Sequence, residues 1–442
     1  LLSNIVRIFK DIPENCTVDI FGEIYEYFLS NFALAEGKDG GTFYTPATVV
    51  RYMVEVLDPQ PGDKKFLDPA CGSGGMFVQA ARYMHTHNAS EAEQMKFRCY
   101  GVEKEPDTVK LAKMNLLLNN VRGDITEANS FYSDPYNAFG AFDYVMANPP
   151  FNVDEVSFDR VSGDARFNTY GVPRNSTKSA KKTSDKKETV PNANYLWLGY
   201  FATALNENGK AALVMANSAS DAGKSEYEIR KKMIEEGIIS QMVTLPSNMF
   251  SSVTLPATLW FFDKHKPQTD KKDEILFIDA RNVFTQVDRA HRKFSDEQIK
   301  NLGIITRLYH GDTAAFDALL AEYREALAAA PETAEGKETK TKAYWQAQID
   351  WLTDRFPDGV YRDVIGLCKA AKLDGEDGII DQDYSLNAGR YVGVVIEDDS
   401  MTEAEFKETM LGLNAEYESL NEEAKKLETQ ISLNLRGLFK NE

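Results

Sequence analysis

The sequence predicts an α/β fold in which helices cover both faces of a central sheet. Three observations predict it. Apolar runs of strand length alternate with segments of helical periodicity from about residue 64 to residue 264. A loop of small residues, 68–75, follows the first of these runs, and the tetrapeptide 148–151 ends a later one. Because α/β sheets bind ligands where their strands end, both segments are candidate sites.

The first half of the sheet is predicted from short apolar runs and the helices between them. The runs are 65–68, 97–103, a short segment near 124–125, and 142–147. The intervening helices are 75–84 and 107–119. Pro106 lies in the first turn of the second helix, where its missing N–H has no helical partner to lose.

The second half continues the pattern with a helix and three strands. The helix is 195–205, and the strands are 211–215, 238–245 and 258–262. Only the segment from Pro246 to Pro256 separates the last two strands. That short connection predicts an antiparallel pair, which we expect at an edge of the sheet.

The flanks of the sheet predict three further parts around a central domain at 41–290. Residues 1–40 have the aromatic-rich pattern of a helical region, and 291–400 form a mostly helical extension. In 401–442 the apolar residues alternate steps of four and three, the spacing of a coiled-coil seam. These residues are Phe406, Met410, Leu413, Tyr417, Leu420, Ala424, Leu427 and Ile431. The stripe fits a partner helix from another subunit or a helix packed on its own domain.

The formal net charge of −18 argues against a protein that binds nucleic acid by general electrostatic attraction, because phosphate binding needs clustered Lys and Arg. One local cluster departs from this balance. From Arg174 to Lys187, six cations accompany one acid, Asp185, a net charge of +5. The cluster predicts either a nucleic-acid contact or a solvated loop without a partner.

Composition also indicates the cellular environment of the chain and whether the chain is a fragment. No apolar stretch approaches the roughly 20 residues that span a bilayer, so no membrane partner is expected. The four cysteines and five histidines show no metal-ligand or disulfide spacing, which suits a reducing cytoplasm. The sequence starts with Leu1 rather than Met, and we expect it to be a fragment of a longer chain.

The loop 68–75 has the composition of a nucleotide-cofactor site. Its small residues let the backbone approach a ligand, and the following helix offers amide donors to a negative group. Because the loop lacks the spaced glycines of the dinucleotide pattern, it is weakly specific alone. Glu103 strengthens the signal, since an acid ending the second strand can accept hydrogen bonds from both ribose hydroxyls. Alternatively, Glu103 is a surface carboxylate in a charged turn with Lys104 and Glu105.

The tetrapeptide Asn148-Pro149-Pro150-Phe151 supplies groups that can hold a planar amine. The Asn148 side-chain oxygen and the Pro149 carbonyl can accept both amine hydrogens, which brings the nitrogen nearer to tetrahedral geometry and exposes its lone pair. Prolines fix the backbone and have no donor of their own. Phe151 can stack on a base swung out of a duplex. Standing alone, the tetrapeptide also fits a simple turn.

Taken in order, 68–75, Glu103 and 148–151 resemble the cofactor loop, ribose-binding acid and catalytic motif of S-adenosylmethionine-dependent amino-methyltransferases. More closely, 41–46, 384–387 and 390–392 resemble the modification subunit of type I restriction-modification systems. The resemblance runs from about Gly22 to the tail. It implies a Rossmann-like methyltransferase sheet with flanking helices in 41–290, and an N-terminal helical region that is truncated here.

The resemblance also implies roles for individual residues. The implied cofactor-binding residues are Thr42, Phe43, Tyr44, Thr45, Pro46, Ala47, Asp68, Cys71, Gly72, Ser73, Glu103, Asn129 and Asn148. The implied catalytic residues are Asn148, Pro149, Pro150 and Phe151, without a metal. Thr45 would bind the methionine carboxylate of S-adenosyl-L-methionine. Asn129 would meet the cofactor adenine, with Asp124 as a competing candidate, and turn chemistry is the alternative for both.

The function that the resemblance implies is methylation of adenine N6 in double-stranded DNA. A specificity subunit would choose the sequence and meet the helical tail, with two modification subunits to each specificity subunit. A restriction endonuclease subunit is a further partner whose joining the sequence leaves open. Two alternatives remain: a methyltransferase that acts on a protein glutamine amide or an RNA adenine, and a non-catalytic assembly scaffold.

Overall fold

The computed structural model describes residues 45–87, 90–174, 188–250, 256–289, 291–334, 336, 339–395 and 403–438. The predicted helical region 1–40, the residues Thr42, Phe43 and Tyr44, and most of the basic segment, 175–187, lie outside these ranges. The strands of the central sheet are β1 Lys65–Asp68, β2 Arg98–Glu103, β3 Gly123–Glu127, β4 Phe142–Ala147, β5 Leu205–Ala216, β6 Ile239–Thr244, β7 Ala257–Asp263, β8 Glu274–Asp279 and β11 Cys368–Lys372.

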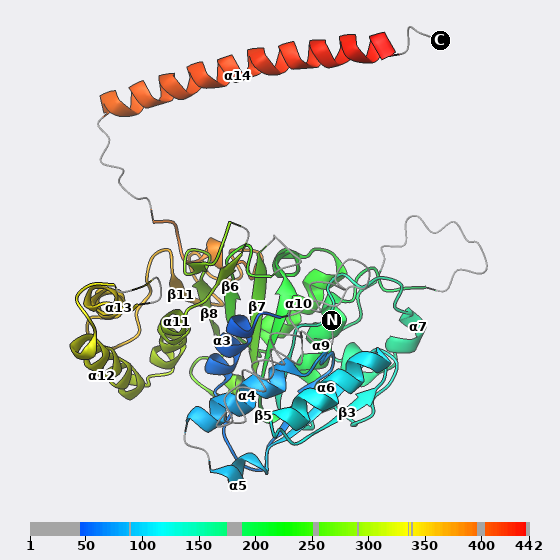
Figure 1. Ribbon diagram of the computed structural model, residues 1–442. Coiled ribbons are helices and arrows are strands. Elements are labelled where there is room, and N and C mark those ends of the chain that lie inside the picture. The colour runs from blue at the N-terminus through cyan, green and yellow to red at the C-terminus, as the bar shows by residue number, and fades with distance from the viewer. Residues whose placement is uncertain are drawn as a thin grey trace, which may run out of the picture. The chain divides into compact units, whose positions relative to one another are not determined.

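These strands lie side by side in the order β11-β8-β6-β7-β5-β4-β1-β2-β3 (Figure 1). The run from β3 to β5 is parallel throughout, and β7 is antiparallel to both β5 and β6. Because β8 is parallel to β6, and β6 in turn points the same way as β5, seven strands end at one edge of the sheet. We call this edge, where β1 to β6 and β8 end, the carboxyl edge.

Helices cover both faces of the sheet and divide the core into two clusters. On the first face lie α3 Ala47–Leu57, α4 Gly75–Thr86, α6 Pro106–Leu118, α11 Asp296–Tyr309, α12 Thr313–Ala329 and α13 Lys342–Arg355. On the second lie α7 Phe158–Val161, α8 Ala165–Asn168, α9 Asn194–Ala204 and α10 Ser225–Glu235. Successive side chains of a strand point to opposite faces of the sheet. Phe66 and Met146 therefore face the first cluster, while Leu67 and Val145 face the second.

The predicted α/β fold with helices on both faces is confirmed, and most predicted elements lie within two residues of the observed ones. The strand predicted at 211–215 begins earlier, at Leu205. The antiparallel pair is confirmed as β6 and β7, but its placement at a sheet edge was wrong. β7 lies between β5 and β6, and β8 and β11 extend the sheet beyond β6.

β11 was not predicted, because its residues Cys-Lys-Ala-Ala-Lys lack the apolar pattern of a strand. This segment is a strand because it pairs in antiparallel register with β8, from Cys368 opposite Ile278 to Lys372 opposite Glu274. It lies beyond the expected domain limit at residue 290 and still belongs to the same sheet. The domain limits themselves stay a prediction.

The predicted tail helix is present as α14, Glu403–Leu438. The chain divides into two compact units, 1–393 and 394–442, so the helix is described by itself. Its large seam residues are between 50% and 64% exposed, including Phe406, Met410 and Tyr417. The identity of the partner that would cover this seam stays a prediction. Among the described helices, none is both long and apolar enough to cross a membrane.

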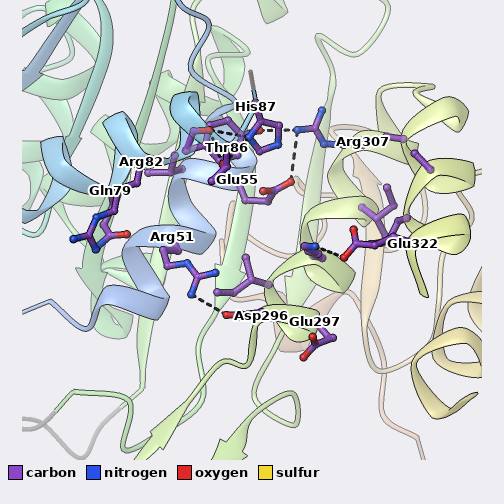
Figure 2. A pocket seen from close by; sticks show the side chains of 18 of the residues that line it. Arg51, Glu55, Gln79, Arg82, Thr86, His87, Asp296, Glu297, Arg307 and Glu322 are labelled. Carbon is purple, nitrogen blue, oxygen red and sulfur yellow. Dashed lines mark hydrogen bonds and ion pairs between the residues drawn. The ribbon is translucent and has the colours of Figure 1, made fainter. Parts of the chain in front are cut away.

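A cavity of about 1250 Å³ lies on the first face, between α3, α4, α11 and α12 (Figure 2). Its charged walls are paired across the gap. Arg51 bonds Asp296 at 2.8 Å, and Arg307 approaches Glu55 at 3.6 Å. Of the predicted site residues that the structure describes, Ala47 alone lines it. The cavity is therefore a gap between helices, and the predicted motifs lie instead at the carboxyl edge.

Candidate active site

The order of the strands brings the two predicted motifs together. The chain runs outward from β1 to β2 and β3, then returns to the other side of β1 as β4. At such a reversal the loops that follow the two central strands separate and leave a crevice. Leu67 of β1 pairs with Val145 of the neighbouring strand β4. Asp68 ends β1 and Asn148 directly follows β4, so the two residues lie at the ends of neighbouring strands. Neighbouring strands are about 4.8 Å apart.

Two backbone conformations in the loop after β1 require glycine. Gly72 has φ +51° and Gly74 has φ +79°, both in the left-handed region. A Cβ atom at Gly74 would also lie 2.8 Å from the Leu116 side chain, whereas one at Gly72 would meet no described atom within 4 Å. The buried Asn115 side chain donates to the Ser73 carbonyl at 2.9 Å and fixes the start of α4. The loop is thus closed against α6 and open beside Gly72.

Glu103 at the end of β2 is tied to this loop. One carboxylate oxygen accepts the Gly72 N–H at 3.0 Å, and the other accepts the N–H groups of Lys104 and Glu105 at 2.7 and 2.9 Å. The alternative of a charged turn is therefore partly right, yet the same carboxylate also reaches the glycine loop. A carboxylate offers about four acceptor positions, and three are in use. A ribose with two hydroxyls would therefore displace one of the backbone donors.

Asp68 is 1% exposed and its side chain accepts the Ala70 N–H at 3.0 Å. Burial raises the pKa of Asp68 well above its usual range; the Ala70 N–H opposes this rise, and the negative charge of Glu103 adds to it. A buried carboxyl group of this kind gains most from a cationic ligand, since a nearby positive charge would favour its ionised form.

The segment after β3 also lies against the glycine loop. The Ser130 hydroxyl donates to the Pro69 carbonyl, and the Asn129 side chain accepts the Phe131 N–H at 3.0 Å. Asp124 is paired with Tyr100, three residues before the end of β3, which places it about 10 Å from the carboxyl edge. This geometry favours Asn129 over Asp124 as a neighbour of the cofactor, although part of the Asn129 side chain already serves a turn.

Arg166, which the sequence did not single out, braces the same segment. Its side chain is 4% exposed and donates from Nη1 to the carbonyls of Ser130 and Ser133, at 3.1 Å each. Asp164 neutralises it through a 2.7 Å bond to Nη2. A buried Arg close to an Asp is a weak signal in sequence, because the two carbonyls lie more than 30 residues away along the chain.

Asn148 has an unusual position for an amide side chain. Both its Oδ1 and Nδ2 atoms are buried and make no hydrogen bond to any described group. Burying an unsatisfied polar atom costs about 1–3 kcal/mol, so native structures rarely keep one without a reason. Phe151, three residues on, is half-buried and packs against both core clusters. The amide is therefore available to a planar donor that enters the crevice between β1 and β4.

Three amide side chains fix the turn that follows the tetrapeptide. The Asn152 N–H donates to Asn194 Oδ1 at 2.8 Å, while Nδ2 atoms of Asn192 and Asn194 both donate to Asn152 Oδ1 at 3.0 Å. Asn152 has φ +55°, a conformation that Asn tolerates better than most residues. We call these residues the amide clamp. They hold the turn after Phe151 against the start of α9.

Thr45, Pro46 and Ala47 lie at the N-terminal end of α3. The Pro46 carbonyl accepts the N–H groups of Val49 and Val50, which begins the helix. α3 packs against α4, the helix that follows the glycine loop. The predicted role of Thr45 stays a prediction, as do the roles of Thr42, Phe43 and Tyr44 outside the described residues.

Comparison with known proteins identifies the family. The sequence model of the N-6 DNA Methylase family matches residues 16–400 of this chain. The chain belongs to this family. It is 34% identical over 435 residues to the type I restriction enzyme MjaIX methylase subunit of Methanocaldococcus jannaschii, covering 97% of this chain and 65% of that relative. With the HindI methylase subunit of Haemophilus influenzae it shares 33% identity over 422 residues, covering 95% and 78%.

A solved structure supports the fold of this chain. The methyltransferase subunit of the type I restriction-modification system of Streptococcus thermophilus has a TM-score of 0.59 and 22% identity, and the match covers 85% of this chain and 64% of that one. The chain thus spans slightly less than two thirds of this protein and of the MjaIX subunit. The resemblance to type I modification subunits is confirmed.

Replacing Asp68 by Asn tests whether its burial is costly. The amide can still accept the Ala70 N–H, so we expect the cofactor-free variant to be more stable than the wild type at neutral pH, by about 1–3 kcal/mol. Because the folded-state pKa is raised, the carboxyl group favours folding below its unfolded pKa of about 3.9 and loses that contribution as the pH rises. The free energy of unfolding of the variant, measured by urea denaturation, should therefore increasingly exceed that of the wild type as the pH rises above 4. A difference that is constant with pH would contradict this account.

Replacing Asn194 by Asp tests the amide clamp. The change removes the Nδ2 donor and brings a carboxylate against Asn152 Oδ1, so the turn after Phe151 should loosen. We expect kcat for methyl transfer to fall by roughly 10- to 100-fold, because small misplacements of reacting groups are costly. Cofactor KM should be unchanged in the same steady-state assay. Asn208→Asp, at an exposed position, is the control, and equal kcat in the two variants would refute the clamp.

Proposed function

We propose that this N-6 DNA methylase transfers the methyl group of S-adenosylmethionine to N6 of adenine in double-stranded DNA. The observation that carries the proposal is the buried amide of Asn148, which has no hydrogen-bond partner among the described residues. Asn148 directly follows β4, the strand next to β1, which the glycine loop follows. A duplex cannot offer its adenine amine to a crevice inside a sheet edge, so the base must swing out of the stack. The aromatic ring of Phe151 follows directly and can stack on it.

The described residues fit S-adenosylmethionine. The open side of Gly72, the N-terminus of α4 and the Glu103 carboxylate suit a nucleoside with two ribose hydroxyls. Asp68 suits the positive end of the methionine part, because its burial makes a cationic neighbour favourable. When bound, this cofactor supplies an electrophilic methyl group on a sulfonium.

The residues of this chain then prepare the amine. The adenine N6 lone pair is delocalised into the ring, which makes the amine a poor nucleophile. Asn148 Oδ1 and the Pro149 carbonyl would accept one N6 hydrogen each and draw the nitrogen towards tetrahedral geometry. Pro149 and Pro150 hold these acceptors rigid, and the amide clamp fixes the turn behind them. Held by these acceptors, N6 would face the methyl group that the cofactor supplies and would give up one proton to solvent.

We further propose that the chain works as a subunit. Its relatives are named methylase subunits of type I restriction enzymes. A specificity subunit would select the DNA sequence and cover the exposed seam of α14, which matches the coiled-coil spacing. Two modification subunits would share one specificity subunit, a restriction endonuclease subunit would join them, and the complex would act in the cytoplasm.

Replacing Asn148 by Ala should abolish methyl transfer and leave cofactor binding intact. Loss of one positioned hydrogen-bonding group at a reacting centre typically costs roughly 10²- to 10³-fold in kcat. The assay is transfer of labelled methyl to duplex DNA in the presence of the specificity subunit, with N6-methyladenine identified in the digested product. Cofactor affinity is measured by calorimetry, and Asn208→Ala, with an exposed side chain, is the control.

The same assay separates the alternatives. A scaffold would transfer no label in the wild type, and Asn148→Ala would change nothing. Wild-type protein that binds cofactor but labels glutamine or RNA, and never duplex DNA, would contradict the proposed substrate.

A further inference from the structure

A small basic hairpin lies at the carboxyl edge, away from the cofactor half. It consists of β9 Thr285–Gln286 and β10 Arg292–Lys293, which pair antiparallel. The hairpin follows β8 directly, and β8 ends at the same edge as β4. The cofactor half of this edge is formed by the ends of β1, β2 and β3. The ends of β5, β6 and β8 are therefore the half left for the substrate.

The base of the basic hairpin is anchored to the body of the domain. The Arg292 N–H donates to the Asn248 carbonyl at 2.9 Å, and its side chain donates to the Ser247 hydroxyl at 3.1 Å, both in the segment after β6. Phe294 is 1% exposed and meets the ring of Tyr52 on α3 at 5.8 Å. The hairpin thus presents its charges from a fixed position, which limits the entropy lost on binding.

Two cations of the basic hairpin are exposed, and two nearby acids each accept a hydrogen bond from another side chain. Arg289 and Lys293 are exposed and form no ion pair with a described carboxylate. The guanidinium of Arg292 lies 3.9 Å over the Phe284 ring. The neighbouring Asp279 is bound by Arg281, and Asp288 by His291 at 2.8 Å. In a chain of net charge −18, this is a local site for a polyanion.

The distance between the basic hairpin and the tetrapeptide 148–151 determines which part of a DNA substrate the hairpin can contact. Four strand spacings separate β4 from β8, about 19 Å along the edge. The hairpin follows β8 and is anchored to the segment after β6, so we expect it to meet a part of the duplex other than the adenine held at Asn148. A duplex carries one negative charge per roughly 1.7 Å of its axis, so one that extends from Asn148 along this edge brings many phosphates past the hairpin.

We propose that the basic hairpin binds the phosphate backbone of the duplex whose adenine enters the crevice. Arg289 and Lys293 make the contacts, and Arg292 is held ready by Phe284 and Ser247. The inference rests on the proposed function and adds a substrate contact to it. Because phosphates carry no sequence information, the hairpin strengthens binding to all sequences alike and leaves the choice of site unchanged.

The test is the salt dependence of DNA binding by the complex of this chain with its specificity subunit. Each lost phosphate contact lowers the slope of log affinity against log salt by about 0.9. The double variant Arg289→Ala with Lys293→Ala should therefore lose about 1.8 from the slope. Its affinity deficit relative to the wild type should shrink about tenfold between 50 and 200 mM salt. The deficit should be equal for cognate and non-cognate duplexes.

The control is Lys96→Ala with Arg98→Ala, two exposed cations at the opposite edge of the sheet, where β2 begins. Wild-type slopes in the control and a reduced slope in the hairpin variant would support the inference. A hairpin variant with the wild-type slope overturns it, even where the wild type methylates adenine and the proposed function holds. If the hairpin variant shows the reduced slope but the wild type transfers no methyl group to DNA, the inference about the hairpin is supported and the proposed function is contradicted.

Discussion

The reversal of strand order between β1 and β4 is the constraint on which the site depends. It places Asp68 and the tetrapeptide 148–151 at the ends of neighbouring strands, although 80 residues separate Asp68 from Asn148 in the chain. It also divides the carboxyl edge into two halves. On the proposed function, the loops after β1, β2 and β3 would hold the cofactor, and the ends of β5, β6 and β8 would be left for the substrate. A methyl donor and an acceptor amine can thus meet from opposite sides.

This arrangement keeps two polar groups in costly environments. Asp68 is buried beside another carboxylate, and the Asn148 amide is buried without a hydrogen-bond partner among the described residues. Both costs are removed when ligands bind, since a cation can neutralise Asp68 and an amine can donate to Asn148. The surroundings are correspondingly rigid. Arg166 braces the segment after β3, and the amide clamp fixes the turn after Phe151, so the unsatisfied groups cannot simply turn away.

The sequence predicted these parts unequally, for physical reasons. β4 is a mostly apolar run bounded by loop residues, so its limits follow from composition. β11 has one cysteine and two alanines as its apolar residues and is a strand through its pairing with β8. Asp68, Glu103 and Asn148 belong to recognisable motifs. Arg166 and Asn194 do not, because each acts on partners 33 to 42 residues away that only the fold brings close.

The most direct test of the central claim is a structure of the complex with duplex DNA and a cofactor analogue that cannot donate its methyl group. The account predicts an adenine outside the stack, with its N6 within about 3.2 Å of both Asn148 Oδ1 and the Pro149 carbonyl. The analogue should lie over Gly72 and Glu103. An adenine that remains paired in the duplex, or an Asn148 side chain bonded to a protein group instead, would contradict the account.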